Sequence, residues 1–156
     1  MTGHGNEGLE LSSLQDLYQQ VILDHYRRPR NKGPLVGATH TITLNNPLCG
    51  DVIDLMLRLE GDRIAEVHFE GKGCSISQAS ASMMSGVLTG STIQEALQVM
   101  ATFTRMLHGD MDAAADTDLG DLRALEGVSK FPVRVKCALL AWNCLGELVG
   151  PDTTHS

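Results

Sequence analysis

The chain has 156 residues, of which 42% are hydrophobic, enough for one domain with a core of its own. Its 12 Lys and Arg against 19 Asp and Glu give a net charge of −7, which argues against binding to a nucleic-acid backbone. No apolar run reaches the length of a membrane span, and the first residues lack the pattern of a secretion signal. We therefore expect a cytoplasmic protein that binds neither nucleic acid nor membranes.

The two ends of the chain are expected to be tails around a single domain. Residues 1–10 are rich in Gly and polar residues, which predicts a disordered N-terminal tail. The domain is expected over residues 11–150, and residues 151–156 form a C-terminal tail.

The first predicted element is a helix. Its start is expected at Ser12 or Ser13, either of which can cap a helix, and its end is expected before Pro29. Between these points apolar residues recur on one helical face. Cations gather at its C-terminal end, where they complement the helix dipole or offer a docking patch to a partner: Arg27, Arg28, Arg30 and Lys32.

Three strands are predicted next. The segments "ATHTITLNN" (38–46), "DVIDLMLRLE" (51–60) and "RIAEVHFEG" (63–71) are rich in β-branched and apolar residues, and the first alternates in polarity. The last two flank Gly61-Asp62, a pair of turn-forming residues that favours a hairpin. Short connections between consecutive strands are typical of an antiparallel meander.

The rest of the chain has helical patterns. They are expected at 74–90, at 91–109 behind a capping box of Ser91 and Gln94, at 119–125 after an acidic surface excursion, and at 131–150 with Pro132 in the first turn. One helix, three strands and then helices predict an α+β fold, with the helices packed on one face of a small three-stranded antiparallel sheet.

Three of the four cysteines lie in contexts that favour a thiolate or a metal ligand. Cys49 and Asp51 flank Gly50 on the loop between the first two strands, so both side chains can turn toward one point. Cys74 precedes a predicted helix and so faces the positive end of its dipole, and Cys137 follows a lysine.

Together these residues form a plausible tetrahedral set of three sulfurs and one oxygen, in which Lys72 and Lys136 would offset the negative charge. Iron–sulfur clusters are also held by thiolates. The long gaps between the residues fit many sites, and the alternative is that they are ordinary buried cysteines.

The motifs "NPLCGD", "GKGCSISQASASMMS" and "FPVRVKCALLAW" resemble the IscU-like iron–sulfur scaffold family, most closely its SufU-type branch. The resemblance covers residues 14–149 and implies an α+β fold with metal ligands at Cys49, Asp51, Cys74 and Cys137. IscU-type proteins carry a His immediately before the third cysteine, where this chain has Lys136. That difference and the long segment before it favour the SufU-type branch, whose members resemble zinc-dependent sulfurtransferases.

The resemblance also implies a mechanism and partners. Cys49 is expected to be the catalytic residue, leaving the Zn²⁺ to accept persulfide sulfur from a pyridoxal-phosphate cysteine desulfurase of the SufS type. Downstream iron–sulfur assembly proteins would then receive the sulfur. Two alternatives remain: a scaffold that assembles a transient [2Fe–2S] cluster on the same ligands, and a small structural zinc domain without chemistry.

Other residues with metal-binding or reactive side chains are expected to be structural. Cys144 lies two helical turns after Cys137, too far to share a metal with it, and is assigned to the core. His25 ends an apolar helical face and is assigned to packing or capping, and Asp54 lies on a strand away from the loop tip.

Overall fold

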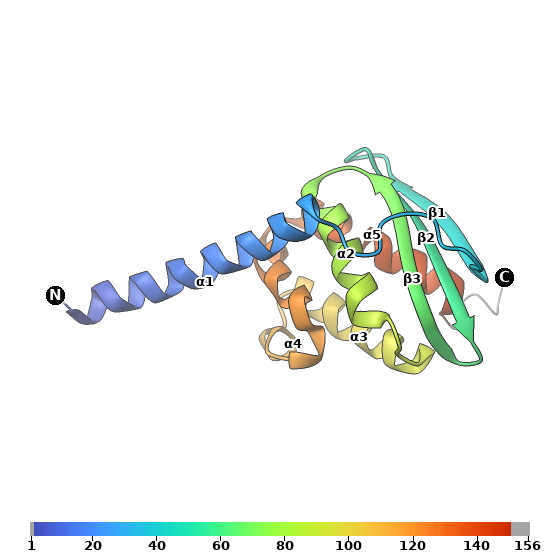
Figure 1. Ribbon diagram of the computed structural model, residues 1–156. Coiled ribbons are helices and arrows are strands. Elements are labelled where there is room, and N and C mark those ends of the chain that lie inside the picture. The colour runs from blue at the N-terminus through green and yellow to red at the C-terminus, as the bar shows by residue number, and fades with distance from the viewer. Residues whose placement is uncertain (1, 151–156) are drawn as a thin grey trace.

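The computed structural model describes residues 2–150, with side chains from residue 15 onward. Nine elements follow one another along this part of the chain (Figure 1). They are α1 (Thr2–Arg27), β1 (His40–Asn46), β2 (Asp51–Glu60), β3 (Arg63–Lys72), α2 (Ser75–Leu88), α3 (Ile93–Leu107), α4 (Met111–Ala114), the 3₁₀ helix η1 (Thr117–Lys130) and α5 (Pro132–Val149).

The three strands form one antiparallel sheet in the order β1-β2-β3, as predicted. Gly61, whose φ is +63°, makes the tight turn between β2 and β3. Along β2, Ile53, Leu55 and Leu57 are fully buried at alternate positions, so one face of the sheet meets the core.

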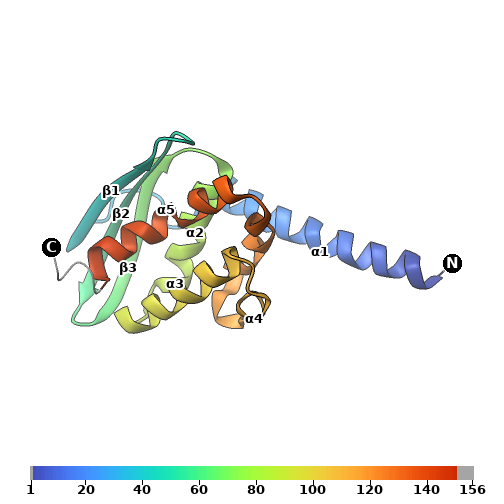
Figure 2. The same cartoon turned by 180° about the vertical axis from the view of Figure 1, so that it is seen from behind.

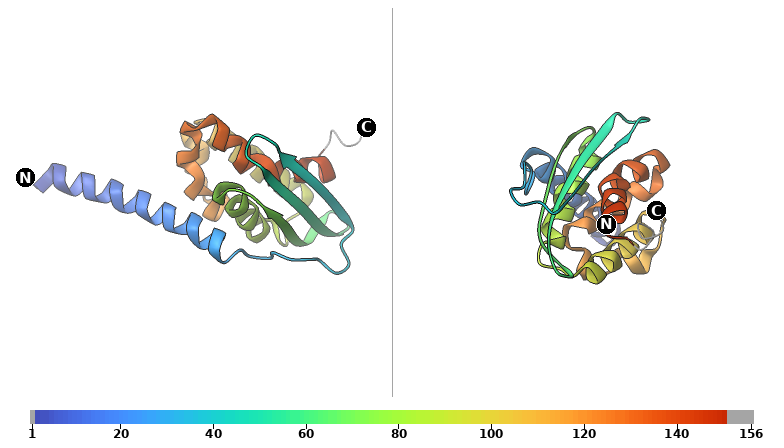
Figure 3. Two further views of the ribbon diagram at one scale, coloured as in Figure 1. Left: turned by 90° about the horizontal axis from the view of Figure 1, so that it is seen from above. Right: turned by 90° about the vertical axis from the view of Figure 1, so that its right-hand side faces the viewer.

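The helices cover that face of the sheet and confirm the predicted α+β class. Helix α5 packs against β1 and β2, and α2 packs against β3. Seen from behind, α5 lies in front of the sheet (Figure 2), and the view from the side separates the sheet from the helical layer (Figure 3). The start of α5 is thereby held against one end of the sheet, where β1 leads into β2.

Helix α1 is longer than expected. It begins at Thr2 rather than at Ser12 or Ser13, and its N-terminal part projects from the rest of the molecule (Figure 1). Residues 2–10 are therefore helical in the structure, where a disordered tail was predicted. The predicted C-terminal tail, residues 151–156, lies outside the described residues, and the division into tails and domain stays a prediction.

The capping box of α3 lies one residue later than predicted. Thr92, not Ser91, is the N-cap, and its side chain and that of Glu95 each accept a hydrogen bond from the other's backbone N–H. The carbonyl of Ser91 is occupied by the N–H of Ile64 at the start of β3. Pairing with the strand therefore delays the helix by one residue.

The segment before α5 is a 3₁₀ helix, which contains the short helix predicted at 119–125 and extends it at both ends. Its apolar residues recur every third position and are all buried: Leu119, Leu122, Leu125 and Val128. A period of three matches the three residues per turn of a 3₁₀ helix. Gly120, with a φ of +55°, kinks the segment near its start. The acidic side chains Asp118 and Asp121 face solvent, as predicted.

Candidate metal and sulfur site

The four predicted site residues come from three parts of the fold that meet at one end of the sheet. Cys49 lies on the turn between β1 and β2, and Asp51 is the first residue of β2. Cys74 is the N-cap of α2, and Cys137 lies in the second turn of α5. The packing of α5 against β1 and β2 brings Cys137 to the turn that carries Cys49.

Two of the sulfurs are in contact. The Sγ atoms of Cys137 and Cys49 lie 3.0 Å apart, well beyond the roughly 2.05 Å of a disulfide bond, and both cysteines are free. Each of three residues, Cys49, Asp51 and Cys137, offers one ligand atom, and these three atoms lie within 4.8 Å of one another. They are close enough together to bind one metal ion.

Asp51 joins Cys74 to this group. Its carboxylate is fully buried, and Oδ1 accepts a hydrogen bond of 2.8 Å from the backbone N–H of Cys74. The Sγ of Cys74 lies 3.8 Å from Oδ2 of the same carboxylate. Asp51 therefore sits between the Cys49–Cys137 pair and the start of α2.

Gly73 makes the close approach of Asp51 to Cys74 possible. Its φ is +148°, and a Cβ atom at this position would lie 2.1 Å from Oδ1 of Asp51. Only glycine fits this backbone conformation and this space at once.

Burial alone would keep the Cys137 thiol protonated. Burial, followed by the hydrogen bond with Cys49 and the nearby Asp51 and Cys74, raises the pKa of Cys137 far above its ordinary value. Cys137 is fully buried, whereas Cys49 and Cys74 are partly exposed. A cation among these side chains would reverse the effect, because a metal ion binds the thiolate form.

The residues present fit a thiophilic metal ion. Three sulfurs and one carboxylate provide four donors, the number that zinc takes in tetrahedral sites. A sulfur–sulfur distance of 3.0 Å is shorter than the roughly 3.8 Å that a tetrahedron with zinc–sulfur bonds of about 2.3 Å would give. A modest opening between Cys49 and Cys137 would therefore admit the ion.

The two lysines beside the site are exposed. Lys72 ends β3 two residues before Cys74, and Lys136 immediately precedes Cys137 on α5. Among the described side chains neither lysine takes part in an ion pair, and their predicted role in offsetting the charge of the site stays a prediction.

Cys144 and His25 are structural, as predicted. Cys144 is fully buried in the core, and burial raises its pKa to about 12. The ring of His25 is also buried, with Nδ1 2.8 Å from Oγ of Ser82 and Nε2 2.8 Å from Oδ2 of Asp121. His25 thereby ties the end of α1 to α2 and η1.

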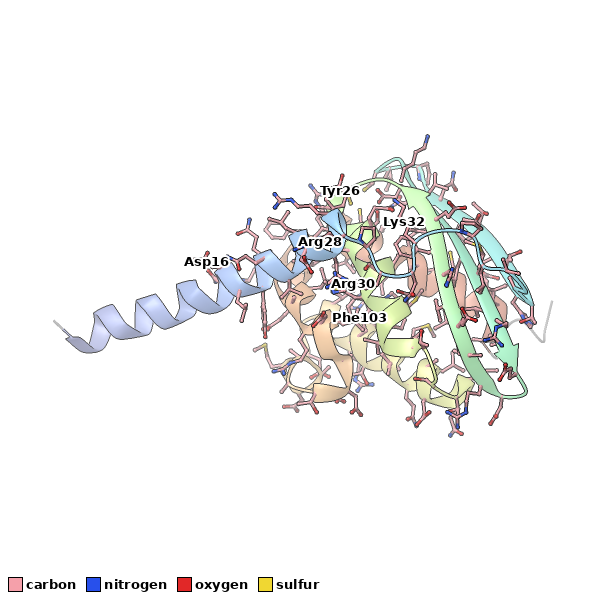
Figure 4. The ribbon with its side chains drawn as sticks, viewed as in Figure 1. Asp16, Tyr26, Arg28, Arg30, Lys32 and Phe103 are labelled. Carbon is pink, nitrogen blue, oxygen red and sulfur yellow. The ribbon has the colours of Figure 1, made fainter. Side chains whose placement is uncertain are left out.

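The basic residues after α1 are partly used within the fold. Arg28 and Arg30 both pair with Asp24 one or two turns back along the chain, at 2.6 and 2.7 Å. These two guanidinium groups hold the pKa of Asp24 below its ordinary value, with Arg30 the larger cause. Figure 4 shows Arg28, Arg30 and Lys32 around the junction of α1 and the following loop.

Comparison with known proteins gives consistent matches. The family model described as the NifU-like N terminal domain matches residues 17–138. The zinc-dependent sulfurtransferase SufU of Bacillus subtilis is 49% identical over 90% of this chain and 95% of its own length. The iron-sulfur cluster assembly scaffold protein IscU of Streptococcus pyogenes is 43% identical over 90% of this chain and 87% of its own.

A solved structure agrees with the fold. The crystal structure of a putative iron-sulfur cluster assembly scaffold protein for the SUF system from Fervidobacterium islandicum superposes with a TM-score of 0.72. It is 34% identical and covers 83% of this chain and 93% of that chain. Within residues 2–150, no helix is both long enough and apolar enough to cross a membrane.

Proposed function

This chain belongs to the family of NifU-like N-terminal domains, and from that premise we propose that it accepts persulfide sulfur on Cys49 for iron–sulfur cluster assembly. The Streptococcus and Fervidobacterium relatives are named for iron–sulfur cluster assembly, and the Bacillus relative is named a zinc-dependent sulfurtransferase. The observation that carries the finer proposal is the contact between a partly exposed sulfur, Cys49, and a buried one, Cys137, beside a buried carboxylate.

The residues that would hold a zinc ion are Cys49, Asp51, Cys74 and Cys137. When bound, the ion supplies positive charge that keeps the thiols ionised, and it takes no part in redox chemistry. Asp51 is suited to remain a ligand of the ion while Cys49 leaves it. Its burial and its hydrogen bond from the Cys74 backbone fix its position.

Cys49 is the best placed of the site cysteines to act as nucleophile. It lies on a short turn beside Leu48, which is 73% exposed, so an incoming group can reach it. Cys137 is fully buried within a regular helix and cannot meet a partner without unfolding α5. The turn also includes Gly50, with a φ of +69°, where an added Cβ would meet no atom within 4 Å.

The transfer step is a thiol exchange. The Cys49 thiolate attacks the outer sulfur of a persulfide carried by a cysteine of the donor enzyme. A new sulfur–sulfur bond forms on Cys49 as the donor's sulfur–sulfur bond breaks. The donor cysteine leaves as a thiolate, so no external oxidant or reductant is needed.

The donor we propose is a pyridoxal-phosphate cysteine desulfurase of the SufS type. The surface around Cys49 is suited to such a partner, because large apolar side chains are exposed there: Leu48, Phe131 and Val133. Exposed apolar groups beside a reactive residue are typical of a surface that a partner covers.

The alternative function is a scaffold that holds a transient [2Fe–2S] cluster. Thiolates are the usual ligands of such clusters, and the Streptococcus relative is named a scaffold protein. Both functions use the same side chains. They are distinguished by whether Cys49 receives persulfide sulfur or serves as a cluster ligand.

The test is to add the purified protein to a cognate desulfurase and cysteine, and to follow alanine release. We expect wild type and Cys144→Ala, which lacks a thiol outside the site, to accelerate release, and Cys49→Ser to lose the acceleration. Metal analysis after aerobic and anaerobic purification accompanies it. Iron with acid-labile sulfide and little acceleration would support the scaffold and contradict sulfur transfer.

A further inference from the structure

An apolar groove lies between α1 and the helices that follow the sheet. Its volume is about 1110 Å³, and side chains from α1, α3, α4, η1 and the starts of α2 and α5 line it. Met111 and Phe131 in its walls are 69% and 59% exposed, so the groove is open to solvent. Other apolar side chains that line it are Tyr18, Ile22, Ile76 and Val128. An open apolar surface of this kind is typical of a site that another protein segment covers.

An apolar stripe runs along α1 toward its N-terminus. Tyr18 and Val21 pack against the core, and Leu14 and Leu11 precede Tyr18 by four and by seven residues. Alternating steps of four and three keep these positions on one face of a helix. Leu17, three residues after Leu14, is 54% exposed. Apolar residues at this spacing are typical of a helix that pairs with another helix.

The backbone carries the first part of α1 away from the rest of the molecule. The helix is continuous from Thr2 to Arg27, and its N-terminal part projects in both of the opposite views (Figures 1 and 2). A continuous helix does not turn back on itself. Residues 2–14 therefore do not lie across a groove that residues 15–22 of the same helix help to form.

We propose that the groove binds residues 2–14 of α1 from a second copy of this chain, with the two α1 helices antiparallel about a two-fold axis. Each copy then supplies one groove and one helical segment, and a single isologous contact fills both grooves. The sizes agree. A helix about 10 Å across fills roughly 420 Å³ per turn, so the groove accepts between two and three turns of the three to four turns in this segment.

Charge favours this occupant. Residues 2–14 contain Glu7 and Glu10 and neither Lys nor Arg. Lys130 and Arg134 line the groove, both are exposed, and neither takes part in an ion pair among the side chains that the structure describes. The two glutamates of one copy therefore meet two available cations of the other.

The acidic residues of the groove do not oppose this pairing. Asp110 lies 3.5 Å from the guanidinium of Arg105, and it also caps α4 by accepting from two backbone N–H groups. Glu126 is then the one carboxylate without an ion pair among the described residues that line the groove, against two cations. The groove is therefore net positive where an acidic helix would enter it.

The test measures the mass of the full-length zinc-loaded protein by sedimentation equilibrium across the micromolar concentration range. Leu14→Glu alters the inserted helix, and Met111→Glu alters the wall that receives it. Val36→Glu is the matched control, because Val36 is an apolar residue that is 93% exposed and lies outside the groove. Urea unfolding of each variant checks that its fold is intact.

We expect the wild-type protein to form dimers as its concentration rises. Leu14→Glu and Met111→Glu should each raise the dissociation constant of the dimer about tenfold or more, because a charge would be buried in an apolar contact. Val36→Glu should stay within about twofold of wild type, since surface changes away from a contact have little effect.

A charge exchange tests the orientation of the two copies. Glu7→Lys with Glu10→Lys, or Lys130→Glu with Arg134→Glu, should weaken the dimer about fivefold or more. The protein with all four changes should return to within about threefold of wild type, because opposite charges then meet again.

The inference is overturned if the wild-type protein stays monomeric throughout the concentration range. It is also overturned if Leu14→Glu and Met111→Glu dimerise as tightly as Val36→Glu, since the contact would then lie elsewhere, or if the fourfold variant is no tighter than the two double variants. Should Leu14→Glu fail to fold, Met111→Glu and the charge exchange still decide the question.

Discussion

Replacing Gly73 by alanine should damage the site through a single methyl group. The added Cβ would lie 2.1 Å from Oδ1 of Asp51 and 2.9 Å from its Cα and Cγ, whereas ordinary contacts begin at 3.4 Å. The Cα of Asp51 is held in a buried strand, so the clash must be relieved by moving the carboxylate, by more than about 1 Å. The close packing of the protein interior opposes such a shift. The hydrogen bond from the Cys74 N–H to Asp51 would be lost.

Two costs add up for Gly73→Ala. Losing a hydrogen bond to a carboxylate costs about 1.5–3 kcal/mol. Forcing a residue with a Cβ to adopt a φ of +148° costs about 1–3 kcal/mol more. We expect the free energy of unfolding of the metal-free protein to fall by about 3–5 kcal/mol, and zinc affinity to fall about tenfold or more because a ligand is displaced.

The matched control is Gly50→Ala, on the loop beside Cys49. Gly50 also has a positive φ, of +69°, but a Cβ there would meet no atom within 4 Å. Only the backbone cost of about 1–2 kcal/mol is expected, with Asp51 left in place. Urea unfolding of the metal-free proteins and competition with a chromophoric zinc chelator measure the two effects. Unfolding and zinc affinity of Gly73→Ala equal to those of the control would refute the reasoning.

Three further predictions concern Asp51, Cys144 and His25. Asp51→Asn keeps an acceptor for the Cys74 N–H but loses the negative charge. Zinc affinity should therefore fall about tenfold or more, while the unfolding midpoint of the metal-free protein changes little. An unchanged zinc affinity in the chelator assay would show that Asp51 is not a ligand. Burial raises the folded-state pKa of Cys144 from its ordinary value of 9.0 to about 12, so stability that is fully present below pH 9 should be lost as pH rises toward 12. That loss should be smaller in Cys144→Ala, and equal slopes of stability against pH would contradict the assignment. His25→Ala removes one buried and one part-buried hydrogen bond and should lower the free energy of unfolding in urea by about 2–4 kcal/mol. Asp121→Ala, at the exposed end of the second bond, should cost less, and the reverse order would contradict the structural role of His25.

The parts of the fold that could be predicted from the sequence are those with a clear local pattern of residues. Alternating and β-branched residues gave strands over 51–60 and 63–71 that the structure repeats almost residue for residue. The cap of α3 was placed one residue early because Ser91 and Thr92 both begin a box of the right spacing. Only the pairing of Ser91 with β3 selects between them, and that pairing is a tertiary contact.

The helix predicted at 119–125 is present, but it is a 3₁₀ helix that spans Thr117–Lys130. The spacing of three from Leu119 to Leu122 and Leu125 distinguishes a 3₁₀ helix from an α-helix, and the acidic residues before Leu119 favoured a surface excursion there instead of the start of the helix. The extension of α1 to Thr2 could not be predicted, because residues 2–10 carry no periodic apolar signal.

At the site, the convergence of Cys49, Asp51, Cys74 and Cys137 was expected from the glycines beside them and from the family resemblance. What the sequence could not show was how Asp51 connects to Cys74, since that depends on the close approach permitted at Gly73.

The most direct test of sulfur transfer is to locate the transferred sulfur atom. The protein would be incubated with a cognate desulfurase and cysteine, trapped with an alkylating reagent and digested for peptide mass spectrometry. We predict the added mass of one sulfur atom on the peptide that contains Cys49, and none on those that contain Cys137 or Cys144. Added sulfur on Cys74 or Cys137 with none on Cys49, or no persulfide at all while alanine release is accelerated, would contradict the proposed role of Cys49.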